Sequence, residues 1–188
     1  DRSKDIDPLR FRRDYGIEKD FLLYVGRVDP SKGCDELFDF FLRHRANGGR
    51  PEKLIILGNS MMPLPDHQDI IALGFVSNQT KWDALAACEA LIMPSPYESL
   101  SMVLLEAWSV AKPVIVNGQC EVLVGQSLRA NGGIWYKSFA EFSQGLFFLQ
   151  EGRNASVLGR QGWRFVRENY SWEVIEQFYF NVISTMIL

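Results

Sequence analysis

Short apolar runs alternate with longer amphipathic segments along the chain, and this alternation predicts a mainly parallel α/β sheet. The apolar runs predict strands at 21–25, 54–57, within 70–76, and at 90–93, 113–116 and 134–136. Most of these runs are apolar throughout and do not alternate with polar residues, so we expect helices on both faces of the sheet. The fold class expected is one doubly wound, Rossmann-like α/β domain spanning residues 1–188.

Apolar residues recur at helical spacing in the segments between and after these strands. The predicted helices cover 35–45, 82–88, 102–110, 139–150, 155–168 and 172–186. In doubly wound folds, ligands bind beyond the carboxyl ends of the strands, where the following helices begin. Functional residues are therefore expected just after Val25, Leu57, Val76, Met93 and Val116.

Composition narrows the class of protein. The chain has 188 residues, 47% of them hydrophobic, and a net charge of −3. That length is typical of one domain with a sizeable core. The negative net charge gives no indication of nucleic-acid binding. No apolar run is long enough for a transmembrane helix. Three widely spaced cysteines, Cys34, Cys88 and Cys120, fit a reducing compartment. We expect a cytoplasmic protein, with any attachment to the inner membrane face being peripheral.

The segment after the first strand, 26–33, has the chemistry of a diphosphate clamp. Gly26 permits a tight turn, and Arg27 and Lys32 bring two cations to the loop before the next helix begins. The helix N-terminus adds partial positive charge. The spacing is neither that of a Walker A loop nor that of a GxGxxG dinucleotide fingerprint. Two solvated loop cations without a ligand remain the alternative.

The segment after the fourth strand, 94–107, predicts an anion site at a helix N-terminus. Two prolines end the strand, and Ser99 or Ser101 is a suitable N-cap. We expect the backbone N–H groups of Leu100, Ser101, Met102 and Val103 to be unpaired and to face the strand ends.

Two glutamates accompany this helix. Glu98 lies just before it, and Glu106 lies within it among apolar neighbours. A carboxylate is costly to bury unless it meets hydrogen-bond donors, and paired sugar hydroxyls are such donors. A surface glutamate together with a capping glutamate is the alternative.

These residues, in this order, resemble the family-four retaining glycosyltransferases of GT-B architecture. The shared pattern is Gly-Arg, then Lys-Gly after four residues, Pro-Ser-x-x-Glu with a second Glu after seven, then Glu-Ala and Pro-Val. The resemblance covers nearly the whole chain, including the Asn-Tyr-Ser-Trp stretch at 169–172. It implies the C-terminal, nucleotide-sugar-binding domain of such an enzyme, without the N-terminal acceptor domain.

The resemblance also implies a role for each site residue. Arg27 and Lys32 would contact the donor diphosphate, Glu98 the transferred sugar and Glu106 the ribose. These assignments make Glu98, Arg27 and Lys32 the catalytic group, without a covalent protein nucleophile. The remaining donor-binding residues would be Gly26, Ser99, Leu100, Ser101, Met102 and Val103 near sugar or phosphate, and Gly74, Phe75, Val76 and Lys81 near the base.

The reaction implied is transfer of a hexose from a UDP- or GDP-sugar to an acceptor hydroxyl with retention of configuration. We expect no cofactor and no metal, because two cations and a helix N-terminus would stabilise the leaving diphosphate. The family's Gly-Gly-x-x-Glu segment is replaced here by 117–121, so sugar specificity does not carry over.

The expected partners are the nucleotide sugar and the absent N-terminal domain. Nucleic acid is not expected, and any peripheral membrane contact is expected only through the absent half. The alternatives are an epimerase-like protein that binds nucleotide sugars and a non-catalytic nucleotide-binding regulatory module.

Overall fold

The computed structural model describes residues 5–187, which form a six-stranded parallel sheet with helices on both faces. The strand order is β3-β2-β1-β4-β5-β6, and all pairs are parallel. The strands are β1 (Phe21–Val25), β2 (Lys53–Leu57), β3 (Ile70–Ala72), β4 (Ala90–Met93), β5 (Val114–Asn117) and β6 (Gly133–Tyr136). The expected doubly wound α/β class is confirmed, with its topological switch between β1 and β4.

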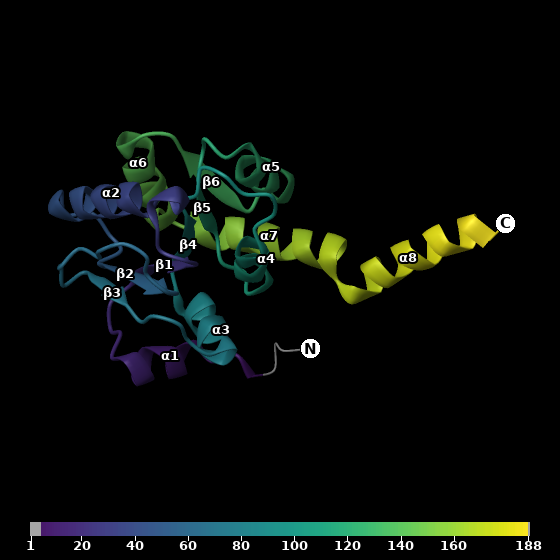
Figure 1. The fold of residues 1–188 in the computed structure, drawn as a ribbon, viewed down its shortest axis with the longest axis horizontal. Coiled ribbons are helices and arrows are strands. Elements are labelled where there is room, and N and C mark those ends of the chain that lie inside the picture. The colour runs from purple at the N-terminus through teal and green to yellow at the C-terminus, as the bar shows by residue number, and fades with distance from the viewer. Residues whose placement is uncertain (1–4, 188) are drawn as a thin grey trace.

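The described part of the chain has eight α-helices, of which α1 to α7 lie around the sheet and α8 extends away from it (Figure 1). They are α1 (Pro8–Tyr15), α2 (Cys34–Ala46), α3 (Asn78–Ala87), α4 (Met102–Ser109), α5 (Glu121–Ala130), α6 (Phe139–Gln150), α7 (Asn154–Tyr170) and α8 (Trp172–Ile187), with a 3-10 turn at Pro30–Lys32.

Two apolar clusters fill the two sides of the sheet. On one side, strand residues such as Leu23 and Leu91 pack with Trp108 of α4. On the other, Leu22 and Ile92 pack with residues of α2 and α6 such as Phe41. Successive strand residues belong to opposite clusters, as the pleat of a strand requires.

Four details differ from the sequence prediction. Helices α1 and α5 were not predicted. Helix α3 begins at Asn78 and not at Trp82, because the Ser77 side chain caps it by accepting from the Thr80 N–H. Strand β3 ends at Ala72, two residues before Gly74, whose φ of +66° turns the chain away from the sheet. The remaining predicted elements lie within one or two residues of the observed ones.

Helix α7 lies unusually close to α4. A side chain at Gly162 would collide with the Trp108 ring, and one at Gly159 would collide with the Ala111 carbonyl. The glycines therefore allow a contact that no larger residue would allow at these two positions.

Helix α8, yellow in Figure 1, extends away from the body of the domain. Apolar side chains are exposed along it, among them Trp172, Phe178, Tyr179, Phe180 and Ile183. Exposed apolar surfaces on a helix are typical of contact sites for another element or partner. Among the described residues, no helix is both long and apolar enough to cross a membrane.

Candidate functional site

Several contacts fix the loop that follows β1. The Tyr24 hydroxyl donates to the Arg27 carbonyl over 2.6 Å. The Val28 N–H donates to the Asn59 carbonyl beyond β2, over 2.9 Å. Gly33 has φ +70°, and a side chain there would collide with the Pro94 carbonyl at the end of β4. The segment 26–33, predicted as the diphosphate clamp, is therefore held directly against the segment 94–107, predicted as the anion site.

Arg27 is paired inside its own loop. Its Nε donates to Asp29, and the Ser31 hydroxyl also donates to Asp29. These two hydrogen bonds, from Ser31 and then Arg27, lower the pKa of Asp29 to about 2. Asp29 also caps the 3-10 turn by accepting from the Lys32 N–H at 3.2 Å. The Arg27 side chain remains 60% exposed, so its remaining N–H groups can reach a ligand.

Lys32 meets the first glutamate of the predicted pair. Its Nζ lies 2.8 Å from Glu98 Oε1, across 66 residues of sequence. Lys32 and Glu98 therefore lie next to each other, as expected for two residues of one site. The lysine is not a bare cation, because a carboxylate already neutralises it.

The N-terminus of α4 is the predicted anion site. Ser101, not Ser99, is the N-cap, and its hydroxyl accepts from the Leu104 N–H at 3.3 Å. Within the described residues, the N–H groups of Leu100, Met102 and Val103 have no acceptor. The prediction that the Ser101 N–H is also free is wrong, because it donates to Gln126 Oε1 at 3.4 Å.

Gln126 was missed by the sequence analysis. It lies on α5, is 1% exposed, and has no described partner for its Nε2. Because α5 itself was not predicted, the sequence analysis gave no reason to place this amide beside Ser101.

Glu106 meets a lysine as well. Lys81 Nζ, on α3, lies 2.6 Å from Glu106 Oε1 on α4. The second oxygen, Oε2, is buried and has no partner among the described residues. An unpaired buried carboxylate oxygen is costly, so a hydroxyl donor bound there would be stabilised.

Three adjoining cavities lie along the carboxyl edge of the sheet. The first, about 610 Å³, is lined by the loops after β1, β2 and β3, with Arg27 and Phe75, and by the start of α3, with Lys81. The second, about 190 Å³, is lined by Arg27, Lys32 and the α4 N-terminus. The third, about 650 Å³, is lined by the loops after β4 and β5, with Glu98, by Glu121 at the start of α5, and by Lys32 from the segment after β1. Arg27 is shared by the first two, and Lys32 and Glu98 by the last two.

The walls of these cavities contain most of the predicted residues. The first contains Gly26, Arg27, Phe75, Val76 and Lys81, with the Phe75 side chain 84% exposed. The second contains Gly26, Arg27, Lys32, Glu98, Leu100, Ser101, Met102 and Val103, and the third adds Ser99. Gly74 and Glu106 line none of the three, although Glu106 pairs with Lys81 of the first.

Asn117 holds together the loops that line the third cavity, and the sequence analysis did not predict a role for it. It is 4% exposed, and its Nδ2 donates to the Pro94 carbonyl at 2.8 Å. Its Oδ1 accepts from the Gln119 N–H at 2.9 Å. One side chain therefore joins the loops that follow β4 and β5, which are the two walls of the cavity.

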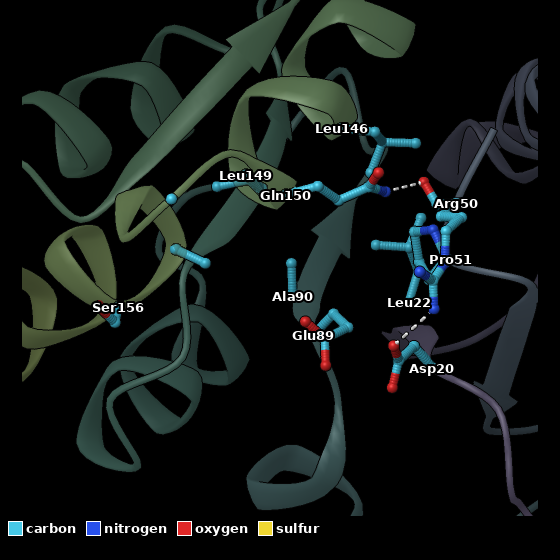
Figure 2. Close-up of a pocket in the computed structure, with 12 residues that line it drawn as sticks. Asp20, Leu22, Arg50, Pro51, Glu89, Ala90, Leu146, Leu149, Gln150 and Ser156 are labelled. Carbon is cyan, nitrogen blue, oxygen red and sulfur yellow. Dashed lines mark hydrogen bonds and ion pairs between the residues drawn. The ribbon is translucent and has the colours of Figure 1, made fainter.

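A further cavity, about 350 Å³, lies at the opposite edge of the sheet (Figure 2). Leu22 and Ala90, at the amino ends of β1 and β4, line it together with Arg50 and Glu89. Arg50 pairs with Asp20 at 3.3 Å, and its carbonyl accepts from Gln150. None of the predicted site residues lines this cavity.

The described residues contain no cluster of three or more His, Cys, Asp or Glu side chains that could hold a metal ion. The two predicted carboxylates, Glu98 and Glu106, each pair with a lysine instead.

The sequence profile described as "Glycosyl transferases group 1" matches residues 19–142. That range contains all three cavities along the carboxyl edge. The chain belongs to the group 1 glycosyltransferases.

Individual proteins that resemble this chain in sequence or in structure include other glycosyltransferases. An uncharacterized glycosyltransferase of Methanocaldococcus jannaschii is 29% identical over a 147-residue match that covers 69% of this chain and 35% of that protein. Among solved structures, Anabaena HepE in complex with UDP superposes with a TM-score of 0.78 at 16% identity, covering 95% of this chain and 52% of that one. The C-terminal domain of a group 1 family protein (LpcC) from Francisella tularensis gives a TM-score of 0.69 at 15% identity, covering 89% and 99%.

The glycosyltransferase domain described here spans about a third of that curated relative and about half of the Anabaena chain. The expected membership of a glycosyltransferase family and the expected Rossmann-like fold are thereby confirmed.

Proposed function

We propose that this chain is the donor-binding half of a retaining hexosyltransferase that uses a nucleoside diphosphate sugar. The observation that carries the proposal is the order of the three adjoining cavities along one sheet edge. A large cavity with an aromatic rim is followed by a small cationic one and then by a large one lined by carboxylates. A nucleotide sugar has the same order of base with ribose, diphosphate and sugar.

The first cavity would hold the nucleoside. Phe75 and Val76 would face the base. Glu106 lines no cavity but pairs with Lys81 of the first, and it would receive the ribose hydroxyls once its buried Oε2 becomes accessible. Lys81 donates to the other oxygen of Glu106, which holds the carboxylate in position. UDP in the Anabaena structural neighbour supports a nucleotide of this kind as the ligand.

The middle cavity would hold the diphosphate. Arg27, Lys32 and the free N–H groups at the start of α4 converge on it from two segments. Departure of the sugar leaves negative charge on the diphosphate, and preorganised cations and amides stabilise that charge most as it develops. Lys32 would exchange its glutamate partner for phosphate, which frees Glu98 for the sugar.

The third cavity would hold the transferred hexose between Glu98 and the loop fixed by Asn117. The acceptor site and the remainder of the catalytic environment would belong to an N-terminal domain. We propose that this domain packs on the apolar side chains exposed along α8. The three cysteines are free and buried, which supports a cytoplasmic location.

Calorimetric titration with UDP, GDP, ADP and NAD tests the proposal. We expect a nucleoside diphosphate to bind and NAD to bind far more weakly, because no GxGxxG turn is present to hold a dinucleotide. A sugar-bearing form of the same nucleotide should bind with additional contacts to Glu98. Preferential binding of NAD would contradict the proposal. If the nucleotide sugar binds to the protein joined with its N-terminal half and is never turned over, the chain is a regulatory module.

A further inference from the structure

Helix α7 and its N-cap carry four arginines, three of them within the helix, on the side that faces away from the domain. At 3.6 residues per turn, the side chains of Arg160, Arg164 and Arg167 fall within an arc of roughly 60°. Arg153, the N-cap, lies in line with them, and all four residues are exposed. Gly162, which contacts Trp108 of α4, lies on the opposite side of the helix. The row is about 21 Å long at 1.5 Å per residue.

Among the described residues, no carboxylate forms an ion pair with this row, although Glu173 of α8 interacts electrostatically with Arg167. Glu168 lies four residues after Arg164, but within the described part of the chain it forms no ion pair with any of the four arginines. Residues 153–170 contain four arginines and one glutamate, a net charge of +3 in a chain of net charge −3. Like charges three and four residues apart destabilise a helix slightly, so the row costs stability unless an anion compensates it.

Apolar side chains accompany the arginines. Trp163 and Val157 are 39% and 38% exposed on the same helix, and the Arg167 guanidinium lies over the Trp163 ring, 4.9 Å from its centroid. Arginine next to exposed tryptophan and valine, on a helix whose other side is packed, is the composition of a helix that lies in a membrane interface.

We propose that this face of α7 docks on an anionic membrane surface, with the arginines on lipid phosphates and Trp163 at headgroup level. The four arginines form a straight row on the outer surface of a single helix. A row of this shape can contact a flat membrane surface, but it does not form a groove that would hold a polynucleotide strand. The surface is separate from the three cavities, so the proposal does not depend on the donor site. It assigns membrane contact to this domain, whereas the sequence analysis expected it only in the absent half.

Vesicle co-sedimentation of the chain tests the proposal. We expect it to bind vesicles of phosphatidylcholine with 30% phosphatidylglycerol at low salt, and to be released as salt rises. The variant R160Q/R164Q/R167Q should partition roughly a hundredfold less, or about fivefold per arginine. The matched control R13Q/K19Q/K137Q removes the same charge from exposed residues outside α7 and should bind as the wild type does. R160K/R164K/R167K should retain most of the binding.

Each other outcome would overturn the proposal. Equal binding to pure phosphatidylcholine would assign the contact to the apolar surface of α8. Equal losses in both glutamine variants would assign it to overall charge. Binding of poly(U) that depends on the three arginines, without vesicle binding, would make the surface a polynucleotide site. Circular dichroism melts of each variant verify folding, and unchanged UDP binding would separate this surface from the donor site.

Discussion

At the residue scale, each lysine of the candidate donor site is held by a glutamate from another segment of the chain. Lys32 pairs with Glu98 and Lys81 pairs with Glu106, at 2.8 and 2.6 Å. The sequence analysis identified all four residues, but it did not pair them. Their separations of 66 and 25 residues give no local pattern, and only the sheet topology brings the segments together.

The diphosphate clamp gives the first prediction. Arg27→Ala and Lys32→Ala should each weaken UDP binding by roughly 1–3 kcal/mol, the range of hydrogen bonds to charged groups. Uridine binding should be nearly unchanged, because both side chains are expected to bind the diphosphate through their charge, although Arg27 also lines the first cavity. Calorimetry with UDP and uridine measures both, and equal losses for the two ligands would contradict the clamp.

The two glutamates should separate by ligand. Glu106→Gln should weaken UDP and a UDP-sugar alike, because both contain the ribose. Glu98→Gln should weaken only the sugar-bearing donor. Paired titrations of each variant with both ligands make the comparison, and the wild type is the reference. Equal loss of UDP affinity in the two variants would show that their roles are assigned wrongly.

His44 is fully buried and gives a prediction about pH. Its Nε2 donates to the Arg50 carbonyl at 2.8 Å, and its Nδ1 accepts from the Ser143 hydroxyl at 2.9 Å. Burial lowers the pKa of the imidazole below its ordinary 6.5. The unfolded chain therefore takes up a proton first as pH falls, and stability is lost below about pH 6.5.

The measurement is the melting temperature at pH 7.5 and at pH 5.5. The wild type should lose more stability over this interval than His44→Asn, which lacks the titrating group. His67→Asn, at the other histidine, is the matched control and should keep the wild-type pH dependence. A pH dependence that is the same in all three proteins would contradict the assignment to His44.

At the element scale, the sequence patterns predicted all six strands of the sheet but missed two of the helices, α1 and α5. Continuous apolar runs such as those of β2 and β4 indicate buried strands directly, because both faces of the sheet are covered. Helix α5 was missed because its short sequence contains Gly125 and two valines, and packing rather than helix propensity determines its structure.

Helix α1 was missed for a different reason. Half of its eight residues are charged, three arginines and one aspartate, so apolar residues at helical spacing do not stand out. The local signals were nevertheless present: Asp7 as N-cap, Pro8 at the first helical position, and Gly16 in the left-handed conformation after the last turn. The α5 omission also concealed Gln126, so one part of the candidate site could not be predicted from sequence.

The contact between α4 and α7 gives a stability prediction. Gly162→Ala should destabilise the domain by roughly 1–3 kcal/mol, the usual cost of overpacking, because the new methyl group would overlap the Trp108 ring. Urea unfolding measures the change. Gly125→Ala in α5 is the control, because its methyl group would meet only the mobile end of Arg129. That variant should be neutral or slightly more stable.

If both alanine variants lose the same stability, the loss reflects a general sensitivity of the helices. The tight fit of α7 on α4 would then not be its cause.

At the scale of the whole molecule, the chain should bind its nucleotide without transferring the sugar. Its carboxyl edge has the three cavities, but an acceptor site is expected on another domain. We predict modest UDP affinity, because domain closure cannot contribute. EDTA should leave the affinity unchanged, since the phosphate charge would be met by Arg27, Lys32 and the α4 N–H groups.

Release of sugar from a UDP-hexose by this chain alone, at rates typical of enzymes, would contradict the division of labour between two domains. A shift of UDP affinity on addition of EDTA would contradict the metal-free site. Isothermal titration and a coupled UDP-release assay provide the two measurements.

The Lys32–Glu98 pair would also determine how the protein responds to small anions that contain no sugar. A lone phosphate offers charge to Lys32 but nothing to the carboxylate that it would displace. A nucleotide sugar would bring phosphate oxygens for Lys32 and hydroxyl groups for Glu98 in one molecule. Under the proposed function, separation of this pair would therefore favour a ligand that contains both kinds of group over free phosphate.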